Sequence, residues 1–308
     1  VDHVNEDNIE EVLMDVIKKG ADIVFEVGVE MMEASLKIAM EHPEVMILNC
    51  SLNTPHKNIR TYYARMYEAK FISGMIAGAL AENNRIAYVA DYPIYGMIAN
   101  INAFALGAAC VNPRAKVYLD WSTRKDHNLD DFLTKNDIQY VSNQDLIRPI
   151  NPTREYGLYK YENGETTNIL MPVWNWGIYY EKLIQSILAG TYQSEDEGEA
   201  KAINYWWGMS AGVIDLVYSN HVPSGVRRLA EHMEYDISVG DVYPFFGEIR
   251  AQDGTIKNNP GEIMSPDDIM KMDYLVENIE GDIPTIDLLK EQAKTIVELK
   301  GVEEAKEE

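Results

Sequence analysis

The chain has 308 residues, of which 50 are acidic and 27 basic, and its formal net charge is −23 at pH 7. This excess of acid excludes a face built for nucleic acid, which needs clustered Lys and Arg. A chain of this length typically forms about two domains and buries about three quarters of its unfolded surface.

Apolar spacing and capping residues predict alternating helices and strands along most of the chain. Helices are predicted at residues 9–17, 32–41, 62–82, 97–110, 129–135, 177–189, 213–218 and 226–239, and a last core helix follows the capping residues 265–268. Strands are predicted at residues 21–27, 45–50, 85–90, 116–121, 138–142, 169–174 and 202–207. The pair Asp253-Gly254 predicts a hairpin. Such alternation favours parallel sheets covered by helices on both faces.

Three segments depart from this regular order. The chain opens with a helix, whereas an α/β lobe usually opens with a strand, so the first βα unit is predicted to be missing. Residues 143–164 are rich in Pro, Asn and Tyr and predict irregular structure. The acidic run at residues 194–199 lacks the spacing of a calcium loop and predicts a solvated turn.

The two cysteines, Cys50 and Cys110, are too few for a disulfide framework and are expected as buried, reduced thiols. The longest apolar run, residues 71–81, is too short to span a bilayer. No signal peptide opens the sequence. We therefore expect either a cytosolic chain or one whose export signal has been removed.

Residues 208–212 read Gly-x-Ser-x-Gly, the pattern of a hydrolase nucleophile elbow, with Ser210 as the nucleophile. The predicted strand before it and the predicted helix after it fit this interpretation. The remaining triad fits less well, because His221 and His232 fall in the next helix or its approach, beside Asp215 or Asp236, and no His-Gly-Gly oxyanion sequence lies upstream. A serine hydrolase therefore stays as an alternative.

Metal and nucleotide cofactors are not expected. The six histidines contain no pair at i, i+4, and no Cys-x-x-Cys is present. No Gly-x-Gly-x-x-Gly or Walker loop offers a cradle for phosphates. Gly74 and Gly78 lie inside a predicted helix and are interpreted as a site of close helix packing.

Large aromatic side chains gather at the ends of the predicted strands and beside glycines. They are Tyr92, Trp121, Trp174, Trp176, Trp207 and Phe246. A cleft wall would use their flat faces, on which a base stacks for about 1–3 kcal/mol. Core packing where two lobes join is the other interpretation, and the sequence leaves both open.

Several of these segments together resemble one family. They are residues 63–71, 85–93, 102–107, 111–113, 172–180, 190–192, 207–208, 244–247, 252–254 and 272–277. In this order they resemble the basic membrane protein family of ABC-transporter substrate-binding lipoproteins, of the purine nucleoside receptor type. The likeness runs from about residue 8 to residue 284. Some relatives carry this module at the end of a longer chain, behind a ParB-like region, and the missing opening strand is typical of such a chain.

The resemblance implies an α/β, two-lobed, type I periplasmic-binding-protein-like fold, in which each lobe is a parallel sheet flanked by helices. Lobe 1 would comprise residues 1–84 and 175–206, and lobe 2 residues 85–174 and 207–284. Residues 285–308 would form an acidic C-terminal helix or tail. The chain would cross between the lobes near Asn84, Trp174 and Trp207, and a ligand would lie between them.

The family's ligand contacts carry over onto a few positions. Trp174 or Trp176 would stack on a base, and Asp126 would be the acid that follows the strand ending at Trp121. Residues 208–212 would be a hinge turn in which Trp207 and Gly208 face the ligand. Ala211 stands where the family has a second acid, and Ser210 where it has a lysine. Tyr92, Trp121 and Phe246 complete the expected wall.

The resemblance thus implies a non-enzymatic protein that closes two lobes on a small planar ligand, most plausibly a purine nucleoside. Closure requires that the ligand bind the closed state better than the open one. An ABC permease would be the partner, and no nucleic acid is expected. The family is extracytoplasmic and membrane-anchored, and a cytoplasmic sensor is the alternative. A degenerate regulatory module without a ligand is a further alternative.

Overall fold

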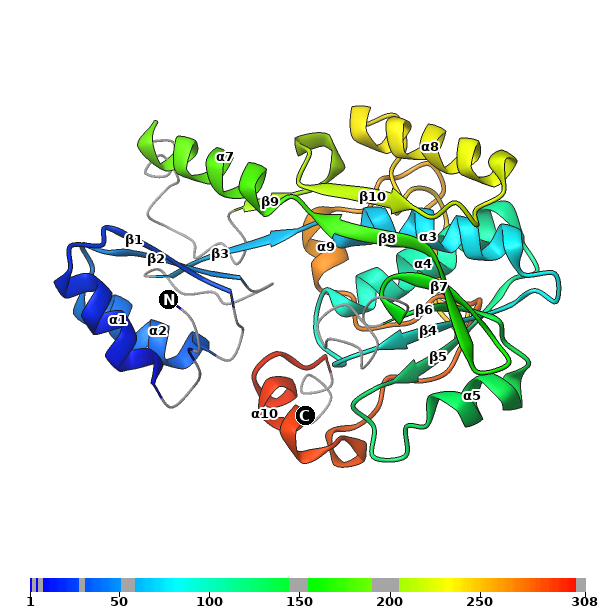
Figure 1. Ribbon diagram of the computed structural model, residues 1–308, viewed down its shortest axis with the longest axis horizontal. Helices are drawn as coiled ribbons and strands as arrows, with labels where there is room; N and C mark the ends of the chain where they lie inside the picture. The colour runs from blue at the N-terminus through cyan, green and yellow to red at the C-terminus, as the bar shows by residue number, and fades with distance from the viewer. Residues whose placement is uncertain are drawn as a thin grey trace. The chain divides into compact units, whose positions relative to one another are not determined.

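The computed structural model describes residues 1, 4, 8–27, 31–50, 59–143, 155–189 and 205–302. The chain divides into two compact units, each made of two stretches of sequence (Figure 1). Unit 1 comprises Val1–Ala64 and Trp176–Trp207, and unit 2 comprises Arg65–Asn175 and Gly208–Glu308. The acidic run at residues 194–199 lies outside the described residues.

In its described part, unit 1 contains a four-stranded sheet in the order β1-β2-β3-β9, and all its strands are parallel. The strands are β1 (Ile23–Glu26), β2 (Met46–Cys50), β3 (Ile59–Ala64) and β9 (Tyr205–Trp207). The first two and the last were expected as strands. The parallel sheet confirms the fold class predicted for this part of the chain.

Helices α1 (Ile9–Lys18) and α2 (Met32–Glu41) lie on one side of this sheet, and α7 (Trp176–Leu188) lies on the other (Figure 1). Alternation along β1 explains both contacts, because successive side chains point to opposite faces. Val24 packs in the apolar core beneath α1 and α2, whereas the ring of Phe25 meets the ring of Tyr180 on α7.

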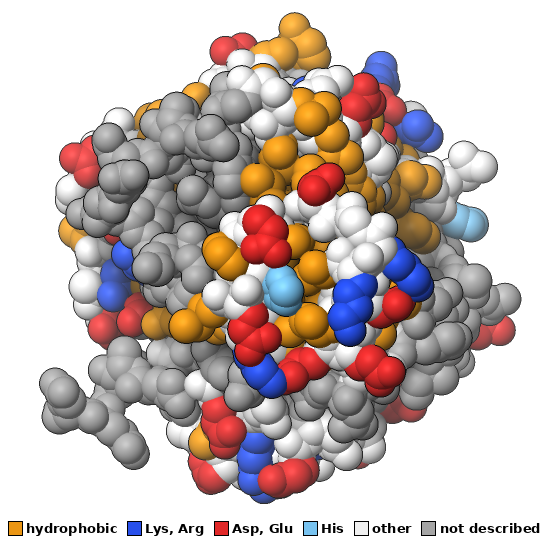
Figure 2. Space-filling view, turned by 90° about the vertical axis from the view of Figure 1, so that its left-hand side faces the viewer, with side chains coloured by type: hydrophobic (Ala, Val, Ile, Leu, Met, Phe, Trp, Pro, Cys, Tyr) orange, Lys and Arg blue, Asp and Glu red, His pale blue; other side chains and the backbone are white. Residues whose placement is uncertain are grey.

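Figure 2 looks onto the side of the molecule that lies at the left in Figure 1. Acidic and basic side chains are interspersed there, with apolar side chains between them. Two basic groups of unit 1 pair with acids of α1: Lys19, just after α1, with Asp15, and Lys37 on α2 with Glu10. Neighbouring charges on this face therefore partly cancel one another.

Strand β3 corrects the helix predicted at residues 62–82. The chain is extended up to Ala64, and helix α3 (Met66–Leu80) begins only after Arg65. The sequence Ile-Arg-Thr-Tyr-Tyr-Ala of β3 is rich in β-branched and aromatic residues, which suit a strand. Pairing with β2 on one side and β9 on the other holds this segment in the sheet.

Unit 2 contains a seven-stranded sheet among its described residues, in the order β10-β8-β7-β6-β4-β5-β13. The strands are β4 (Arg85–Ala90), β5 (Lys116–Trp121), β6 (Tyr140–Ser142), β7 (Leu158–Glu162), β8 (Glu165–Trp174), β10 (Ile214–Tyr218) and β13 (Ile279–Glu280). Strands β6, β4, β5 and β13 run parallel, as expected for the fold class.

Strands β7, β8 and β10 extend this sheet in antiparallel fashion, which the sequence analysis did not anticipate. The cause lies in the segment predicted as irregular. Asn163 and Gly164 form a two-residue turn in which both residues have positive φ, 52° and 81°. That is the geometry of a type I′ hairpin, and Asn-Gly is its preferred sequence.

Helices cover the sheet of unit 2. They are α3, α4 (Met97–Val111), α5 (Leu129–Asn136), α8 (Ser224–Val239), α9 (Pro266–Met270) and α10 (Glu291–Lys300). Helices α3 and α4 touch backbone to backbone, because a Cβ on Gly74 would overlap the carbonyl of Phe104, and one on Gly107 that of Phe71. The interpretation of Gly74 as a site of close helix packing is therefore confirmed.

This packing places α3 in unit 2, whereas the expected first lobe extended to residue 84. The first crossing accordingly falls at residues 64–65 rather than near Asn84, and the others fall at 175–176 and 207–208. The described C-terminal residues also belong to unit 2 rather than to a separate tail. Leu289 is fully buried and bridges Arg124, and Gly301 bridges Ile94.

Two smaller predictions in unit 2 are confirmed. The hairpin at Asp253-Gly254 joins β11 (Ile249–Arg250) to β12 (Ile256–Asn258) in antiparallel pairing. Ser265 caps α9, where its hydroxyl accepts a hydrogen bond from the backbone N–H of Asp268 at 3.1 Å. Within the described part of the chain, no helix has both the length and the apolar character needed to cross a membrane.

Candidate ligand-binding site

An aromatic cluster connects two of the predicted site residues within unit 1. Trp176 opens α7 and stacks on Tyr180, with ring centroids 5.8 Å apart and planes inclined by 21°. One turn along, Tyr179 lies 5.7 Å from Trp176 and 5.1 Å from Trp207 at the end of β9. The spacing of 176, 179 and 180 puts these rings on one helix face. Trp176 and Trp207 therefore belong to one aromatic cluster, in which the buried ring of Tyr179 joins the two half-buried indoles.

Tyr62 on β3 lies at the base of this aromatic cluster and was not predicted. Its ring meets Trp176 edge-on at 6.2 Å, and its hydroxyl lies 3.1 Å from that of Tyr180. Tyr62 is fully buried, and this burial raises its pKa, so the phenol stays neutral. The sequence predicted a helix at residue 62, and so it did not indicate this contact. On strand β3 the side chain of Tyr62 points toward α7.

A polar pair lies at the carboxyl ends of β1 and β2. Glu26 stands opposite Asn49 in the parallel register, and Asn49 Nδ2 donates to Glu26 Oε2 at 3.0 Å. The Ser35 hydroxyl of α2 donates to the same oxygen. Glu26 is only 4% exposed, and its Oε1 has no hydrogen-bond partner among the described residues. Burial raises the pKa of this carboxyl, and the two hydrogen bonds oppose that rise.

The third crossing leads into a tight turn rather than a nucleophile elbow. After β9 come Gly208, the short 3-10 helix η3 (Met209–Ala211) and Gly212, whose φ is 72°. The chain then continues as strand β10, so the helix predicted at residues 213–218 is wrong. A nucleophile elbow needs a helix at this point. Ser210 is exposed, and it makes no hydrogen bond with His221 or His232 within the described part of the chain.

A buried carboxylate holds this turn. Glu68, in the first turn of α3, accepts a hydrogen bond from the backbone N–H of Met209 at 2.7 Å. Arg65 Nη1 lies 3.8 Å from the other oxygen of Glu68. A Cβ on Gly208 would overlap the Glu68 carboxylate, so any other residue there would displace this carboxylate. Burial raises the pKa of Glu68, against the lowering by Met209 and Arg65.

Trp174 lies in unit 2, at the end of β8 beside the same turn. It is half-buried and pairs with Ile214 at the start of β10. The next residue, Asn175, donates from its side chain to the carbonyl of Gly212 at 3.0 Å. Gly208 in turn accepts from the backbone N–H of Val213. Trp174 and Gly208 are therefore brought together at the turn.

Trp121 is part of the core of unit 2. The side chain is 1% exposed, and its indole N–H donates to the carbonyl of Asp282 at 2.8 Å. The ring therefore packs in the core, where the segment around Asp282, after the edge strand β13, covers it. Its part in a ligand site stays a prediction.

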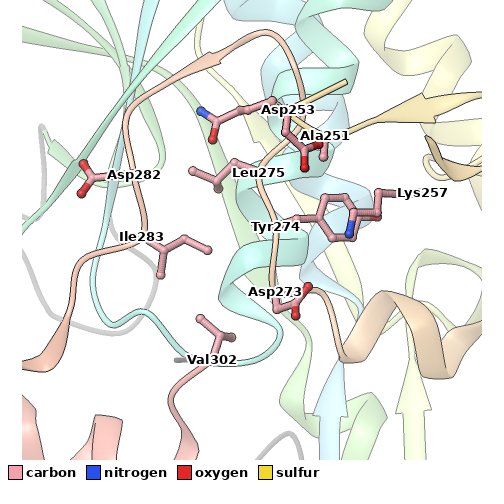
Figure 3. A pocket seen from close by; sticks show the side chains of 10 residues that line it. Ala251, Asp253, Lys257, Asp273, Tyr274, Leu275, Asp282, Ile283 and Val302 are labelled. Atoms are coloured by element: carbon pink, nitrogen blue, oxygen red, sulfur yellow. The ribbon is translucent and has the colours of Figure 1, made fainter. Parts of the chain in front are cut away.

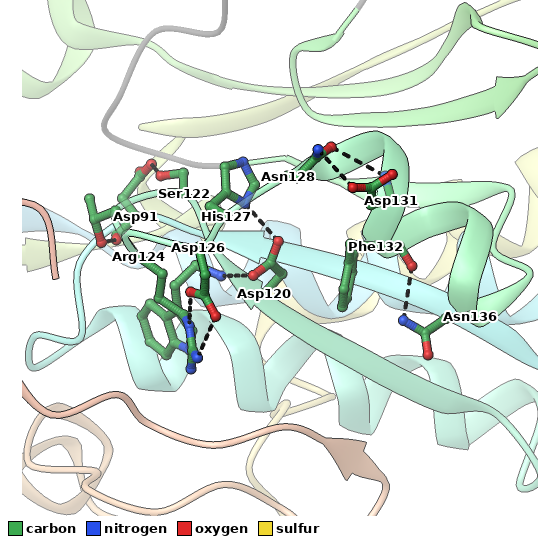
Figure 4. A network of polar contacts seen from close by, with 12 residues as sticks. Asp91, Asp120, Ser122, Arg124, Asp126, His127, Asn128, Asp131, Phe132 and Asn136 are labelled. Carbon is green, nitrogen blue, oxygen red and sulfur yellow. Dashed lines mark hydrogen bonds and ion pairs between the residues drawn. The ribbon is translucent and has the colours of Figure 1, made fainter. Parts of the chain in front are cut away.

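Asp126 lies on the loop after β5, as expected, but it is already paired (Figure 4). Arg124 donates to its two oxygens at 2.9 and 3.1 Å. The arginine lowers the pKa of Asp126, whose side chain is 71% exposed. Close by, His127 Nδ1 lies 2.7 Å from Asp120 Oδ2. Asp120, Trp121, Arg124 and Asp126 line a cavity of about 300 Å³ at the carboxyl end of β5.

The remaining two predicted residues lie elsewhere in unit 2. Tyr92 follows β4 and is half-buried, and its carbonyl accepts from the N–H of Ile94. Phe246 is 57% exposed and forms a bridge to Ile263. Its neighbour Phe245 is the buried ring of this pair and packs on Tyr67 at 5.2 Å.

A second hollow of unit 2 was not predicted. It measures about 420 Å³ and lies between the hairpin of β11 and β12 and the segment at residues 273–283 (Figure 3). Lys257 lies over the ring of Tyr274, with its Nζ 4.7 Å from the ring centroid. Asp253, Asp273 and Asp282 also line it. Among the residues described, no group of three or more His, Cys, Asp and Glu side chains is set to hold a metal ion.

Comparison with known proteins identifies the family of this chain. The profile of the Bmp family, described as ABC transporter substrate-binding protein PnrA-like, matches residues 2–233. The chain therefore belongs to this family of ABC transporter substrate-binding proteins, and the resemblance noted in the sequence is confirmed.

Two curated relatives extend over most of the chain. A purine-binding protein of Brucella abortus (strain 2308) is 25% identical over 282 residues, covering 87% of this chain and 78% of the relative. A putative ABC transporter glucose-binding protein of Haloferax volcanii is 22% identical over 280 residues, covering 86% of this chain and 66% of the relative.

Solved structures share the fold. A transcriptional activator of the comK gene from Bacillus halodurans has a TM-score of 0.59 at 15% identity, over 78% of this chain and 87% of that one. A solute-binding protein of an ABC transporter system from Aeropyrum pernix K1 has a TM-score of 0.55 at 14% identity, over 78% and 81%. At such identities the likeness supports the α/β fold and nothing finer.

Proposed function

We propose that this chain is a non-enzymatic receptor that binds a purine nucleoside and presents it to an ABC permease. The family to which the chain belongs supports the transport role. The purine-binding relative supports the ligand class. Closure of two units on the ligand would be the motion that signals binding, as in other two-unit receptors.

The aromatic cluster of unit 1 is the observation that carries the nucleoside assignment. Trp176, Tyr180 and Trp207 are half-buried rings joined through the buried ring of Tyr179, beside the carboxyl ends of parallel strands. Ligands of α/β sheets bind at those ends. A purine base gains about 1–3 kcal/mol by stacking on one aromatic ring. The ribose hydroxyls are assigned to Asp126, which would exchange its contact with Arg124 for the ligand.

A serine hydrolase is not supported by the turn at residues 208–212. Strand β10 follows it where a nucleophile elbow would start a helix. Ser210 would then be a turn residue, and the chain would bind its ligand without converting it. Incubation of the protein with nucleosides and simple esters should leave both unchanged, and turnover that is lost in Ser210→Ala would contradict this assignment.

Thermal unfolding with adenosine, guanosine and inosine tests the ligand class. A ligand that binds only the folded state raises the melting temperature, by about 2.7 kcal/mol of stability at a concentration of one hundred times Kd. D-glucose serves as a comparison, because one relative carries that name. A shift with glucose alone would replace the nucleoside by a sugar. No shift with any of the four would favour a regulatory module without a ligand.

Trp176→Ala is the sharpest test of the stacking role. Its nucleoside affinity should fall by about tenfold or more, because the variant loses one aromatic face worth about 1–3 kcal/mol. Trp206→Ala is the matched control, since Trp206 is an indole on the same strand as Trp207 whose side chain alternates to the other face. Calorimetric titration measures the nucleoside affinity of both variants. Equal losses of affinity would show that Trp176 has no specific stacking role.

The proposed location is extracytoplasmic and membrane-anchored, with the permease as partner. Cell fractionation of the natural producer would test it. Recovery of the protein in the cytoplasmic fraction would instead favour a sensor of the same ligand. Stimulation of permease ATPase activity by the protein with nucleoside, but not by the protein alone, is the expected signature of the transport role.

A further inference from the structure

One short segment of unit 2, the turn at residues 208–213, lies beside all three crossings between the units. The residues that follow the first crossing and precede the second contact this turn, and the third crossing enters it. The first crossing leads into α3, whose Glu68 accepts from the N–H of Met209 at 2.7 Å. The second leaves from Asn175, which donates from its backbone to Val213 at 2.9 Å and from its side chain to Gly212 at 3.0 Å. The third crossing enters the turn itself at Gly208.

Among these contacts, the one through Glu68 links a side chain of α3 to the turn. The accepting group is a carboxyl that is 5% exposed, and when it is ionised such a bond is stronger than one between neutral groups. Removing one partner leaves a buried backbone N–H without an acceptor. The link is therefore costly to break.

The surroundings of Glu68 strengthen the bond. Its carboxyl group and Ser210 line a cavity of about 290 Å³, whose walls are mostly apolar and include Tyr67, Phe245 and Met264. Few polar groups compete for the bond there, and a hydrogen bond in an apolar setting is less screened than one in water. Arg65, 3.8 Å from the second oxygen, is the charged neighbour on the same helix.

Gly208 shows that the fit is tight. A Cβ at this position would overlap the carboxylate of Glu68. Any other residue would thus push the carboxylate away from Met209. The Gly-x-Ser-x-Gly sequence is explained here by packing, because its first glycine makes room for Glu68 and its second adopts a φ of 72°.

We propose that Glu68 is a positioning residue of the hinge, which fixes the turn at residues 208–213 to α3 and so limits the arrangements that the two units sample. Its loss leaves each unit folded but lets the crossings move independently. The width of the distribution of distances between the units measures this role, and it does not depend on which ligand the protein binds.

Pulsed electron spin resonance on the whole chain tests the proposal. Spin labels are placed at Glu11→Cys on α1 and Arg228→Cys on α8, both exposed, in a background of Cys50→Ser and Cys110→Ser. Glu68→Ala should broaden the distance distribution, whereas Glu68→Gln should keep the original width, because the Gln oxygen still accepts from Met209. Glu234→Ala, which removes a half-buried carboxyl of unit 2 that bonds Tyr218, is the matched control and should change nothing.

Gly208→Ala gives an independent route if Glu68→Ala folds poorly. Alone, Gly208→Ala should broaden the distance distribution as Glu68→Ala does, since the new methyl displaces the carboxylate. Combined with Glu68→Ala, it should cause no further broadening, because the displaced carboxylate is already absent. Unchanged widths in both single variants, or fully additive effects, would overturn the proposal.

A second readout rests on the proposed nucleoside binding. If the competent arrangement becomes a smaller fraction of the population, the apparent nucleoside affinity falls in the same proportion, by about tenfold for a tenfold smaller fraction. Failure of the original protein to bind any nucleoside would contradict the proposed function, while the distance measurement would still decide the role of Glu68.

Discussion

At the scale of single residues, buried carboxyl groups distinguish this chain. Among the described residues, Asp91, Glu26 and Glu68 are each less than a tenth exposed. Each of the two glutamates holds a structural junction: Glu26 joins β1 to β2 and α2, and Glu68 joins α3 to the turn at residues 208–213. Sequence patterns could not find these roles, because a glutamate in an apolar strand or helix gives no sign of its partners.

Glu26 predicts a measurable dependence of stability on pH. Burial raises its pKa in the folded state above the unfolded value, so the folded state binds the proton more tightly. The contribution of Glu26 to stability is then complete below the unfolded pKa, about 4.3, and is lost as pH rises through the folded pKa, at about 1.4 kcal/mol per pH unit. Glu26→Gln cannot ionise, so its stability should fall less than that of the original chain over this window.

Urea unfolding between pH 4 and 8, followed for both proteins, is the measurement. Glu68 has a raised pKa as well, but it is present in both proteins and cancels in the comparison. Glu11→Gln, on the exposed face of α1, is the control and should run parallel to the original chain. A constant difference between Glu26→Gln and the original chain at every pH would show that the carboxyl does not titrate in this window.

At the scale of helices and strands, most elements were predictable, and the two wrong helix predictions share a physical cause. Strands β4 and β5 and helix α2 fall at their predicted bounds, because their apolar patterns are strong and Pro or Gly punctuates their ends. At residues 59–64 and 213–218 the side chains fit a helix or a strand equally well locally. Pairing with strands that are distant in sequence decided both for the strand, and no local pattern carries that information.

The candidate site was predictable in part for the same reason. Trp176 and Trp207 were found because tryptophans beside strand ends are conspicuous in any sequence. Tyr62 and Glu68 were not found, since their roles depend on contacts between segments more than a hundred residues apart. The burial of Trp121 could not be predicted, because the segment that covers it, around Asp282, comes much later in the chain.

The contact of α3 with α4 gives a prediction at this scale. Gly74→Ala should destabilise unit 2 by about 1–3 kcal/mol, because the new methyl overlaps the carbonyl of Phe104 and the helices must separate. This cost exceeds the gain of up to about 1 kcal/mol that Ala brings to a helix. Gly177→Ala on α7 is the control, since no atom lies near its added methyl, and it should be neutral or slightly stabilising. Thermal unfolding of both variants measures the difference, and equal stabilities would contradict the close contact.

On the scale of the whole molecule, division into two units follows from where the chain finds its packing partners. Helix α3 looks in sequence like a continuation of the first unit, yet its small residues fit α4, and the unit boundary moves to Ala64. The resemblance to a family placed the second and third crossings within two residues of the observed ones. It placed the first crossing about twenty residues away. The observed boundary falls inside the segment predicted as one helix, residues 62–82, where the composition does not change.

Net charge acts on the molecule as a whole and leads to the last prediction. A formal charge of −23 opposes compact folding through repulsion, and dissolved salt screens it, with a Debye length of about 10 Å at 0.1 M. The described ion pairs are mostly exposed and contribute little that salt could remove, as for Arg227 with Glu231. Raising sodium chloride from 10 mM to 0.3 M should therefore stabilise the protein by about 1 kcal/mol, a rise of roughly 2–4 °C in melting temperature for a unit of this size. Differential scanning calorimetry measures the melting temperature at each salt concentration, and potassium chloride should raise it as much as sodium chloride does. A melting temperature that falls with salt would mean that ion pairs outweigh the repulsion.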